Sequence, residues 1–238
     1  MRRAIRSRKP GSSGVSANRL VVFDCDGTLV DGQHAIIAAM RDAFRTQRLA
    51  EPSGAVVRRV VGLPLFDAVA RLAPDADTAL VAALARAYKE SFLCRREEPG
   101  HDEPLFPGVI EALDDLVGKS FLLGIATGKS RNGLTATLER HGLSKRFAVL
   151  KTSDDGPGKP SPDMLICAMS DMGAEPGSTV MIGDTVFDVE MARSARVAAI
   201  GVGWGYHESA ELEAAGAAAV ANGFGVVPAL VERMIGRT

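Results

Sequence analysis

Short apolar runs recur along the chain and alternate with segments of helical periodicity. A strand with one solvated face alternates apolar and polar residues, whereas a continuous apolar run is typical of a parallel strand that helices cover on both faces. The alternation of such runs with helices therefore predicts an α/β fold, a Rossmann-like parallel sheet flanked by helices. The predicted strands are residues 20–23, 121–126, 147–150, 179–182 and 197–200.

Some helix boundaries can also be predicted. The triplet at residues 161–163, Ser-Pro-Asp, indicates a helix start with Ser161 as the N-cap, and Gly173 indicates the end of that helix. The alanine-rich stretch at residues 212–220 predicts a final helix followed by a strand.

Residues 32–104 interrupt the alternation. Apolar side chains recur there at helical spacing in successive groups, which proline and glycine residues separate. The pattern predicts an inserted all-helical cap domain between the two parts of an α/β core, residues 19–31 and 105–238. Residues 1–18 are rich in Arg and Lys and are interpreted as a disordered basic tail, with a targeting or polyanion-binding arm as the alternative.

Composition limits the classes of partner. The 238-residue chain has a formal charge of -1 and only 5% aromatic residues, so nothing favours nucleic-acid binding. No apolar stretch approaches the roughly 20 residues that span a bilayer. The three cysteines show no metal-ligand spacing and are expected to be reduced. We therefore expect a cytoplasmic monomer or homodimer without nucleic-acid or membrane partners.

Acidic residues follow two of the predicted strands. Asp24 and Asp26 come directly after the first strand, and Asp184 follows strand 179–182, with Asp188 one helical turn later. The carboxyl ends of parallel strands are where open α/β sheets bind ligands. Clustered carboxylates repel one another unless a cation is present, and oxygen ligands suit Mg²⁺. The pattern predicts a Mg²⁺ site, although Asp24 and Asp26 alone are equally explained as surface acids in a turn.

Two other segments are candidates for binding phosphate. Thr127 and Gly128 follow the second strand, where a hydroxyl and backbone N–H groups before a helix can hold an anion. Lys159 lies just before the helix start at 161–163, so its ammonium can point to the same region; a solvated loop lysine is the alternative. The neighbouring Gly-Lys-Ser letters do not form a P-loop, because Leu123 stands where that motif requires glycine.

In this order and at these strand ends, the motifs around Asp24, Thr127, Lys159 and Asp184 resemble those of the haloacid dehalogenase superfamily of hydrolases. The similarity is greatest to the branch with a helical cap after the first motif, as in phosphoglycolate phosphatases. It implies a phosphatase that acts on a small phosphorylated metabolite, such as phosphoglycolate or a sugar phosphate, through an aspartyl-phosphate intermediate.

The resemblance also implies roles for single residues. Asp24 would be the nucleophile and Asp26 the general acid and base. Thr127, Gly128 and Lys159 would hold the transferring phosphate.

For the metal, the resemblance implies that Asp24, Asp184 and the backbone carbonyl of Asp26 bind Mg²⁺. Asp188 would support the metal or orient Lys159.

Alternatives within and beyond the family remain. Dehalogenases and phosphonate hydrolases of the superfamily lack an acid at the position of Asp26, whereas sugar phosphomutases keep it and are the closest competing enzymes. A catalytically idle member that binds a phosphorylated ligand is the alternative from another class. Gly32 and Gly128 stand where relatives often have serine and asparagine, which weakens the case for phosphoglycolate itself.

The cap is expected to close over the core and to select the substrate. Its candidate contacts are Gln33, His34, Arg58, Arg59 and the loop 62–64, which begins with Gly62. A structural or solvated role is the alternative for each of them.

Overall fold

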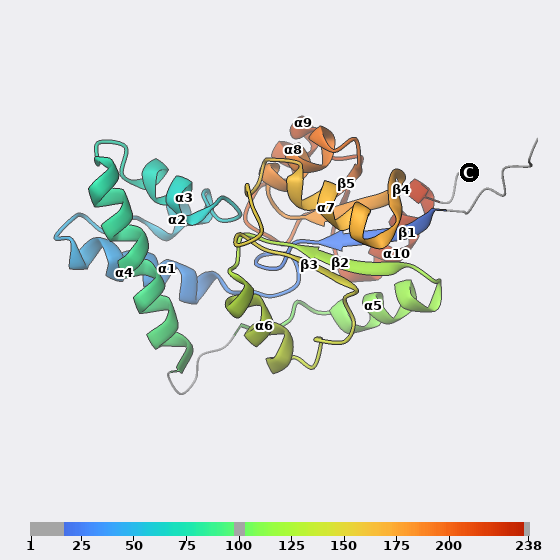
Figure 1. The fold of residues 1–238 in the computed structure, drawn as a ribbon, viewed down its shortest axis with the longest axis horizontal. Coiled ribbons are helices and arrows are strands. Elements are labelled where there is room, and N and C mark those ends of the chain that lie inside the picture. Colours follow the sequence, from blue (N-terminus) through green and yellow to red (C-terminus); the bar gives the residue numbers. More distant parts are fainter. Residues whose placement is uncertain (1–16, 98–102, 236–238) are drawn as a thin grey trace, which may run out of the picture.

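A parallel six-stranded sheet forms the centre of the protein (Figure 1). The computed structural model describes residues 17–97 and 103–235. The strand order is β3-β2-β1-β4-β5-β6, so the order reverses between β1 and β4, where open α/β sheets bind ligands. The strands are β1 Asn18–Phe23, β2 Leu122–Ala126, β3 Val149–Lys151, β4 Ala174–Gly183, β5 Ala198–Val202 and β6 Ala219–Ala221.

Helices cover both faces of this sheet. Val21 and Phe23 of β1 pack toward α5, α6 and α10, whereas Leu20 and Val22 pack toward α7, α8 and α9. All four side chains are fully buried, which explains why the run is continuously apolar. The helices are α5 Val109–Gly118, α6 Arg131–Arg140, α7 Asp163–Met172, α8 Val186–Ser194, α9 Ser209–Ala215 and α10 Val227–Ile235, with a 3-10 turn, η1, at Phe224–Val226.

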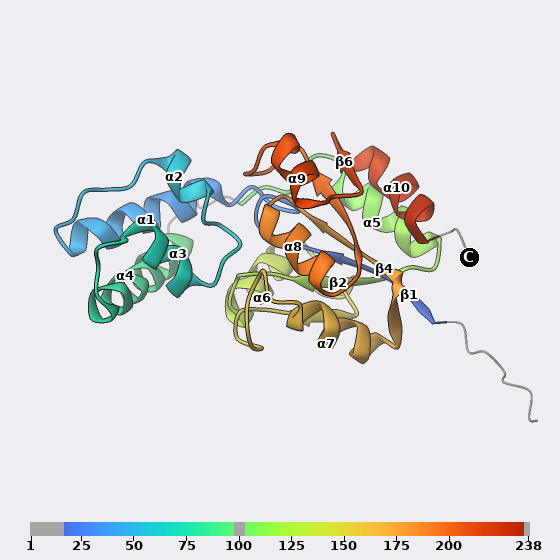
Figure 2. The same cartoon turned by 90° about the horizontal axis from the view of Figure 1, so that it is seen from above.

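The four helices of residues 33–97 stand apart from the sheet and form the predicted cap (Figures 1 and 2). They bury an apolar core of their own, which includes Met40, Phe44, Val69 and Leu84. The insertion therefore packs as a separate unit beyond the carboxyl ends of β1 and β4. Its helices are α1 Gln33–Thr46, α2 Gly54–Arg58, α3 Leu65–Leu72 and α4 Thr78–Glu97.

The chain enters and leaves the cap through adjacent segments. Val30 pairs with Leu105 in an isolated antiparallel bridge, and the backbone N–H of Asp31 donates to the carbonyl oxygen of Pro104 at 2.8 Å. The two junctions of the cap are therefore tied to each other.

Most of the predicted elements are present, with two differences. Each predicted strand overlaps an observed one, and the final helix and strand are confirmed as α9 and β6. The predicted N-cap was wrong: α7 begins at Asp163, and the hydroxyl of Ser161 donates to the Asp163 carboxylate instead of accepting a backbone N–H. β1 already begins at Asn18, inside the segment predicted as tail, because its backbone N–H donates to the carbonyl of Gly173.

Residues 1–16 of the predicted tail lie outside the described residues. Within the described ranges, no helix is both long and apolar enough to cross a bilayer.

Candidate active site

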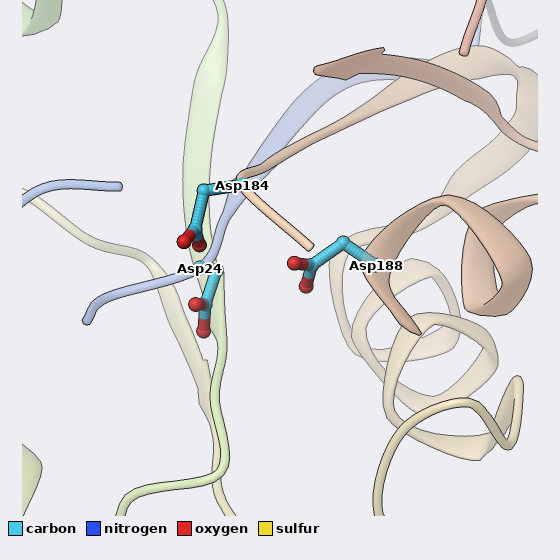
Figure 3. A group of neighbouring side chains, drawn as sticks. All are labelled: Asp24, Asp184 and Asp188. Atoms are coloured by element: carbon cyan, nitrogen blue, oxygen red, sulfur yellow. The ribbon is translucent and has the colours of Figure 1, made fainter. Parts of the chain in front are cut away.

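Three carboxylates converge where β1 and β4 end (Figure 3). Asp24 follows β1, Asp184 follows β4, and Asp188 lies in the first turn of α8. One oxygen from each carboxylate lies within 4.8 Å of the other two, and all three residues are buried. The fold thus brings together three of the four acids that the sequence singled out.

Lys159 completes this cluster from the loop before α7. Its Nζ lies 2.6 Å from Oδ1 of Asp24 and 2.6 Å from Oδ1 of Asp188. The other oxygen of Asp188 accepts the backbone N–H and the hydroxyl of Thr185, at 3.0 and 2.7 Å. Burial alone would lower the pKa of Lys159, but the two carboxylates raise it, so this buried side chain stays charged.

Asp184 is fixed by groups on either side of it. The hydroxyl of Thr28 donates to Oδ1 at 3.1 Å, and the backbone N–H of Tyr206 donates to Oδ2 at 2.9 Å. A Cβ atom on Gly205 would lie 2.1 Å from Cβ of Asp184, and one on Gly27 would lie 2.2 Å from its Oδ2. Only glycine allows the backbone to approach this carboxylate so closely.

The electrostatics of the cluster favour a bound cation. Burial raises the pKa of Asp24 from 3.8 to about 7; the attraction of Lys159 opposes this shift and the repulsion of Asp188 adds to it. Burial, and then repulsion by Asp24, also raises the pKa of Asp184 well above its usual range. Three buried carboxylates face one ammonium, so a hard cation with oxygen ligands would remove the excess negative charge. The donor set therefore fits Mg²⁺.

Asp26 has a different set of partners. The side chain lies outside the three-carboxylate cluster, and its Oδ1 is 2.9 Å from Nζ of Lys129. The same ammonium lies 3.2 Å from Oε1 of Glu103, which is 1% exposed and also accepts the hydroxyl of Thr137. Burial raises the pKa of Asp26, although Lys129 opposes the shift. A Cβ atom on Gly32 would lie 2.6 Å from Oδ1 of Asp26, which explains the glycine at that position.

The two residues after β2 lie between the acids and the cap. Thr127 is buried, and its Oγ1 accepts the backbone N–H of Lys129 at 3.2 Å. Gly128 lies under the cap loop, because an added Cβ would be 3.2 Å from the carbonyl oxygen of Gly62. The close passage of the cap backbone gives a physical reason for glycine at this position.

A cavity of about 440 Å³ lies between the core and the cap. Asp24, Asp26 and Thr127 line it from the core, and Gly62 and its two successors line it from the cap. The predicted phosphate-binding residue Gly128 belongs to the same lining. Asp24, Asp26 and Thr127 thus face a partly open cavity beneath the cap, whereas Lys159, Asp184 and Asp188 lie outside its lining.

Other cap residues that the sequence suggested lie outside the lining of this cavity. Gln33 donates to the carboxylate of Asp31 and accepts from Arg58 at 3.1 Å, so these side chains bind one another. Arg59 pairs with Glu211 of α9, and His34 is exposed.

Sequence reasoning missed Lys129, Glu103 and the backbone of Gly205 and Tyr206. Lys129 follows β2 by three residues, a spacing that could have marked it as a site residue. Glu103 carried no such signal, because its ion pair with Lys129 depends on where the chain returns from the cap. The close approach of Gly205 likewise depends on the packing of a distant loop.

Comparisons with known proteins agree with this geometry. Residues 21–202 match the family model described as haloacid dehalogenase-like hydrolase. The probable phosphatase IndB of Dickeya dadantii is 39% identical over 200 residues, which cover 82% of this chain and 86% of that protein. The phosphoglycolate phosphatase of Agrobacterium fabrum is 28% identical over 221 residues, covering 92% of this chain and 94% of that one.

A solved structure extends the agreement to the whole fold. The crystal structure of a hydrolase from Pseudomonas syringae superposes with a TM-score of 0.80 at 25% identity, covering 90% of this chain and 99% of that chain. The family match spans both the motifs around Asp24 and those around Asp184, which the fold brings together. The chain therefore belongs to the haloacid dehalogenase-like hydrolases and has relatives in that family that are named phosphatases.

Proposed function

We propose that this protein is a magnesium-dependent phosphatase that hydrolyses a small phosphate monoester through an aspartyl-phosphate intermediate. The observation that carries the proposal is the position of Asp24: it lines the cavity between core and cap, and its carboxylate lies 2.6 Å from the Lys159 ammonium, beside the carboxylates of Asp184 and Asp188. The names of the relatives suggest phosphoglycolate, and the resemblance of the sequence adds sugar phosphates, as compounds to test first.

The metal would be held by Asp24, Asp184 and the backbone carbonyl of Asp26. We assign Asp188 to the orientation of Lys159, because its two oxygens are engaged by Thr185 and by the Lys159 ammonium. When bound, Mg²⁺ supplies positive charge that offsets the repulsion between a carboxylate and a phosphate dianion.

The residues of the chain then divide the reaction into two displacements. In the first, a carboxylate oxygen of Asp24 bonds to phosphorus while the bond to the leaving-group oxygen breaks, and protonated Asp26 gives that oxygen its proton. In the second, the Asp26 carboxylate takes a proton from water, whose oxygen bonds to phosphorus as the bond to Asp24 breaks. Lys159 and Thr127 hold the phosphoryl oxygens in both steps, so positioning and charge compensation supply most of the rate.

The proposal is tested by trapping the intermediate. Acetyl phosphate has a good leaving group that needs no proton from Asp26, so an Asp26→Asn variant should form the phosphoenzyme yet hydrolyse it slowly. Acid-quenched protein should then carry one phosphoryl group on the peptide that contains Asp24, as measured by mass spectrometry. Asp24→Asn should carry none and should lose roughly 10³-fold or more of its turnover. Phosphate release by Asp24→Asn at the wild-type rate would overturn the mechanism.

Free phosphate also separates this proposal from its competitors. A phosphomutase returns the phosphoryl group to a sugar, so it would produce an isomer rather than stoichiometric phosphate. An idle ligand-binding member would be stabilised by a phosphorylated ligand without phosphate release.

A further inference from the structure

The cavity is divided between a polar side and an apolar side. Its polar lining comes mainly from the core, where Thr127, Ser130 and Asn132 lie near the acids. From the cap, the lining is largely apolar: its polar members are the phenol of Tyr88 and the cationic side chains of Lys89 and Arg96, and it contains no carboxylate, amide or aliphatic hydroxyl among the residues that the structure describes. The apolar cap residues in the lining are Ile36, Met40, Val57, Val60, Val61, Leu63, Leu65, Phe66, Ala68, Phe92 and Leu93.

An aromatic pair forms one wall of this apolar side. Tyr88 and Phe92 are one turn apart on α4, and their rings stack with centroids 5.8 Å apart and an interplanar angle of 23°. The Phe92 ring also lies 5.5 Å from Nζ of Lys129, which pairs with Asp26. The aromatic wall thus reaches Lys129, the ion-pair partner of Asp26, which would protonate the leaving group. Aromatic rings attract other rings in offset or edge-to-face contact, so this is a surface suited to a ring.

Two large apolar side chains of the lining are exposed to solvent. Phe66 is 44% exposed and Leu93 is 56% exposed, and both lie on the cap side of the cavity. Single exposed apolar residues are common on proteins. Because Phe66 and Leu93 line the same cavity, an apolar ligand bound there would cover both side chains.

The volume of the cavity also favours a large leaving group. About 440 Å³ falls within the range of roughly 300–1,000 Å³ that holds drug-sized ligands, and a two-carbon leaving group would leave most of it unfilled. A sugar would bring several hydroxyls against the aliphatic cap residues, and a buried hydroxyl without a partner is costly.

We propose that the preferred substrates are phosphate monoesters whose leaving group carries an aromatic ring, bound against Tyr88, Phe92, Phe66 and Leu93 of the cap. This inference rests on the proposed phosphatase function and narrows its substrate class. Polar substituents of the leaving group would face Ser130 and Asn132 on the core side.

Matched substrates test the inference. 2-Phenylethyl phosphate and ethyl phosphate release alcohols of similar acidity, so a difference in kcat/KM between them reports binding of the ring rather than leaving-group reactivity. We expect a preference of about tenfold or more for the phenylethyl ester. 2-Cyclohexylethyl phosphate should rank between them, and phosphoglycolate and glucose 6-phosphate should fall below the phenylethyl ester.

Matched variants test which cap residues bind the ring. Leu93→Ala and Phe66→Ala should reduce the ratio of phenylethyl to ethyl kcat/KM by several-fold. Leu49→Ala should leave the ratio unchanged, because Leu49 is a cap residue of similar kind, 36% exposed, that does not line the cavity.

The outcomes separate this inference from the function on which it rests. Acetyl phosphate reports the core chemistry without a ring. If acetyl phosphate is hydrolysed but the phenylethyl ester is no better than the ethyl ester, or phosphoglycolate or the sugar phosphate is better than both, the inference is overturned and the phosphatase proposal stands. If acetyl phosphate and every ester are inert, both fall together.

Discussion

The ammonium of Lys129 lies 2.9 Å from Oδ1 of Asp26, and the side chains of both residues are almost completely buried. Glu103 approaches the same ammonium from the segment that returns from the cap. Asp26, the proposed general acid and base, therefore pairs with a lysine from the loop after β2. That lysine also pairs with Glu103 at the junction of the cap. Removing one member of such a buried ion pair destabilises the folded protein far more than removing one member of an exposed pair.

Replacing Lys129 with methionine should damage both stability and turnover. The substitution leaves the buried carboxylates of Asp26 and Glu103 without the ammonium that lies between them, a change that typically costs about 3–5 kcal/mol. It also raises the pKa of Asp26 further, because the attraction of Lys129 is lost. We expect kcat to fall by about tenfold or more, measured as phosphate release alongside thermal unfolding.

The double variant Lys129→Met with Glu103→Gln separates the two effects. It removes both partners' charges together and should recover much of the stability but not the turnover. Wild-type stability and kcat in Lys129→Met would show that the pair has no role.

Replacing Gly205 with alanine should displace Asp184. The new Cβ would lie 2.1 Å from Cβ of that residue, so either the loop or the carboxylate must move. Overpacking of this kind costs about 1–3 kcal/mol, and we expect weakened Mg²⁺ binding by calorimetry together with a lower Tm. Gly225→Ala is the control, because nothing lies within 4 Å of a Cβ there. Equal effects of the two substitutions would contradict the close-approach argument.

Magnesium should stabilise the folded protein. A ligand that binds only the folded state at about 100 times its Kd adds about 2.7 kcal/mol, so Tm should rise as Mg²⁺ is titrated. Asp184→Asn should abolish the rise and yet leave the metal-free protein at least as stable, because a buried negative charge that Asp24 repels is removed. Asp114→Asn, an exposed acid on α5, should keep the wild-type response. A full Mg²⁺ shift in Asp184→Asn would place the metal elsewhere.

The exposed pair between Arg59 and Glu211 should affect the cap only weakly. It joins the cap to α9 at 2.5 Å, but such pairs contribute about 0–1 kcal/mol and are screened by salt. Arg59→Met should therefore change KM by no more than a few-fold at low salt, and the difference should vanish at high salt. Arg45→Met is the matched control, since Arg45 pairs with Asp42 and Glu51 inside the cap. A large effect that persists in high salt would mean that Arg59 contacts substrate.

The sequence predicted the parts of the site that local patterns determine. Asp24, Thr127 and Asp184 follow apolar runs, and parallel strands deliver such residues to one edge of the sheet. Lys129 and Glu103 were not predicted: Lys129 pairs with Asp26 across the ends of two neighbouring strands, and Glu103 pairs with Lys129 only because the chain returns from the cap beside it. The choice of Ser161 as N-cap was wrong for a local reason: its hydroxyl donates to the Asp163 carboxylate two residues later, and cap preference alone does not account for that competing hydrogen bond.

The paired junctions of the cap have a practical consequence. Val30 bridges Leu105, and Asp31 bonds to Pro104, so the inserted segment begins and ends at neighbouring points. Its length and content can change while the sheet keeps the spacing of its acids. Exchanging the chain between Gly32 and Glu103 for another helical unit is thus a direct engineering route to new substrate ranges, because Gly32 and Glu103 stay beside Asp26 and Lys129.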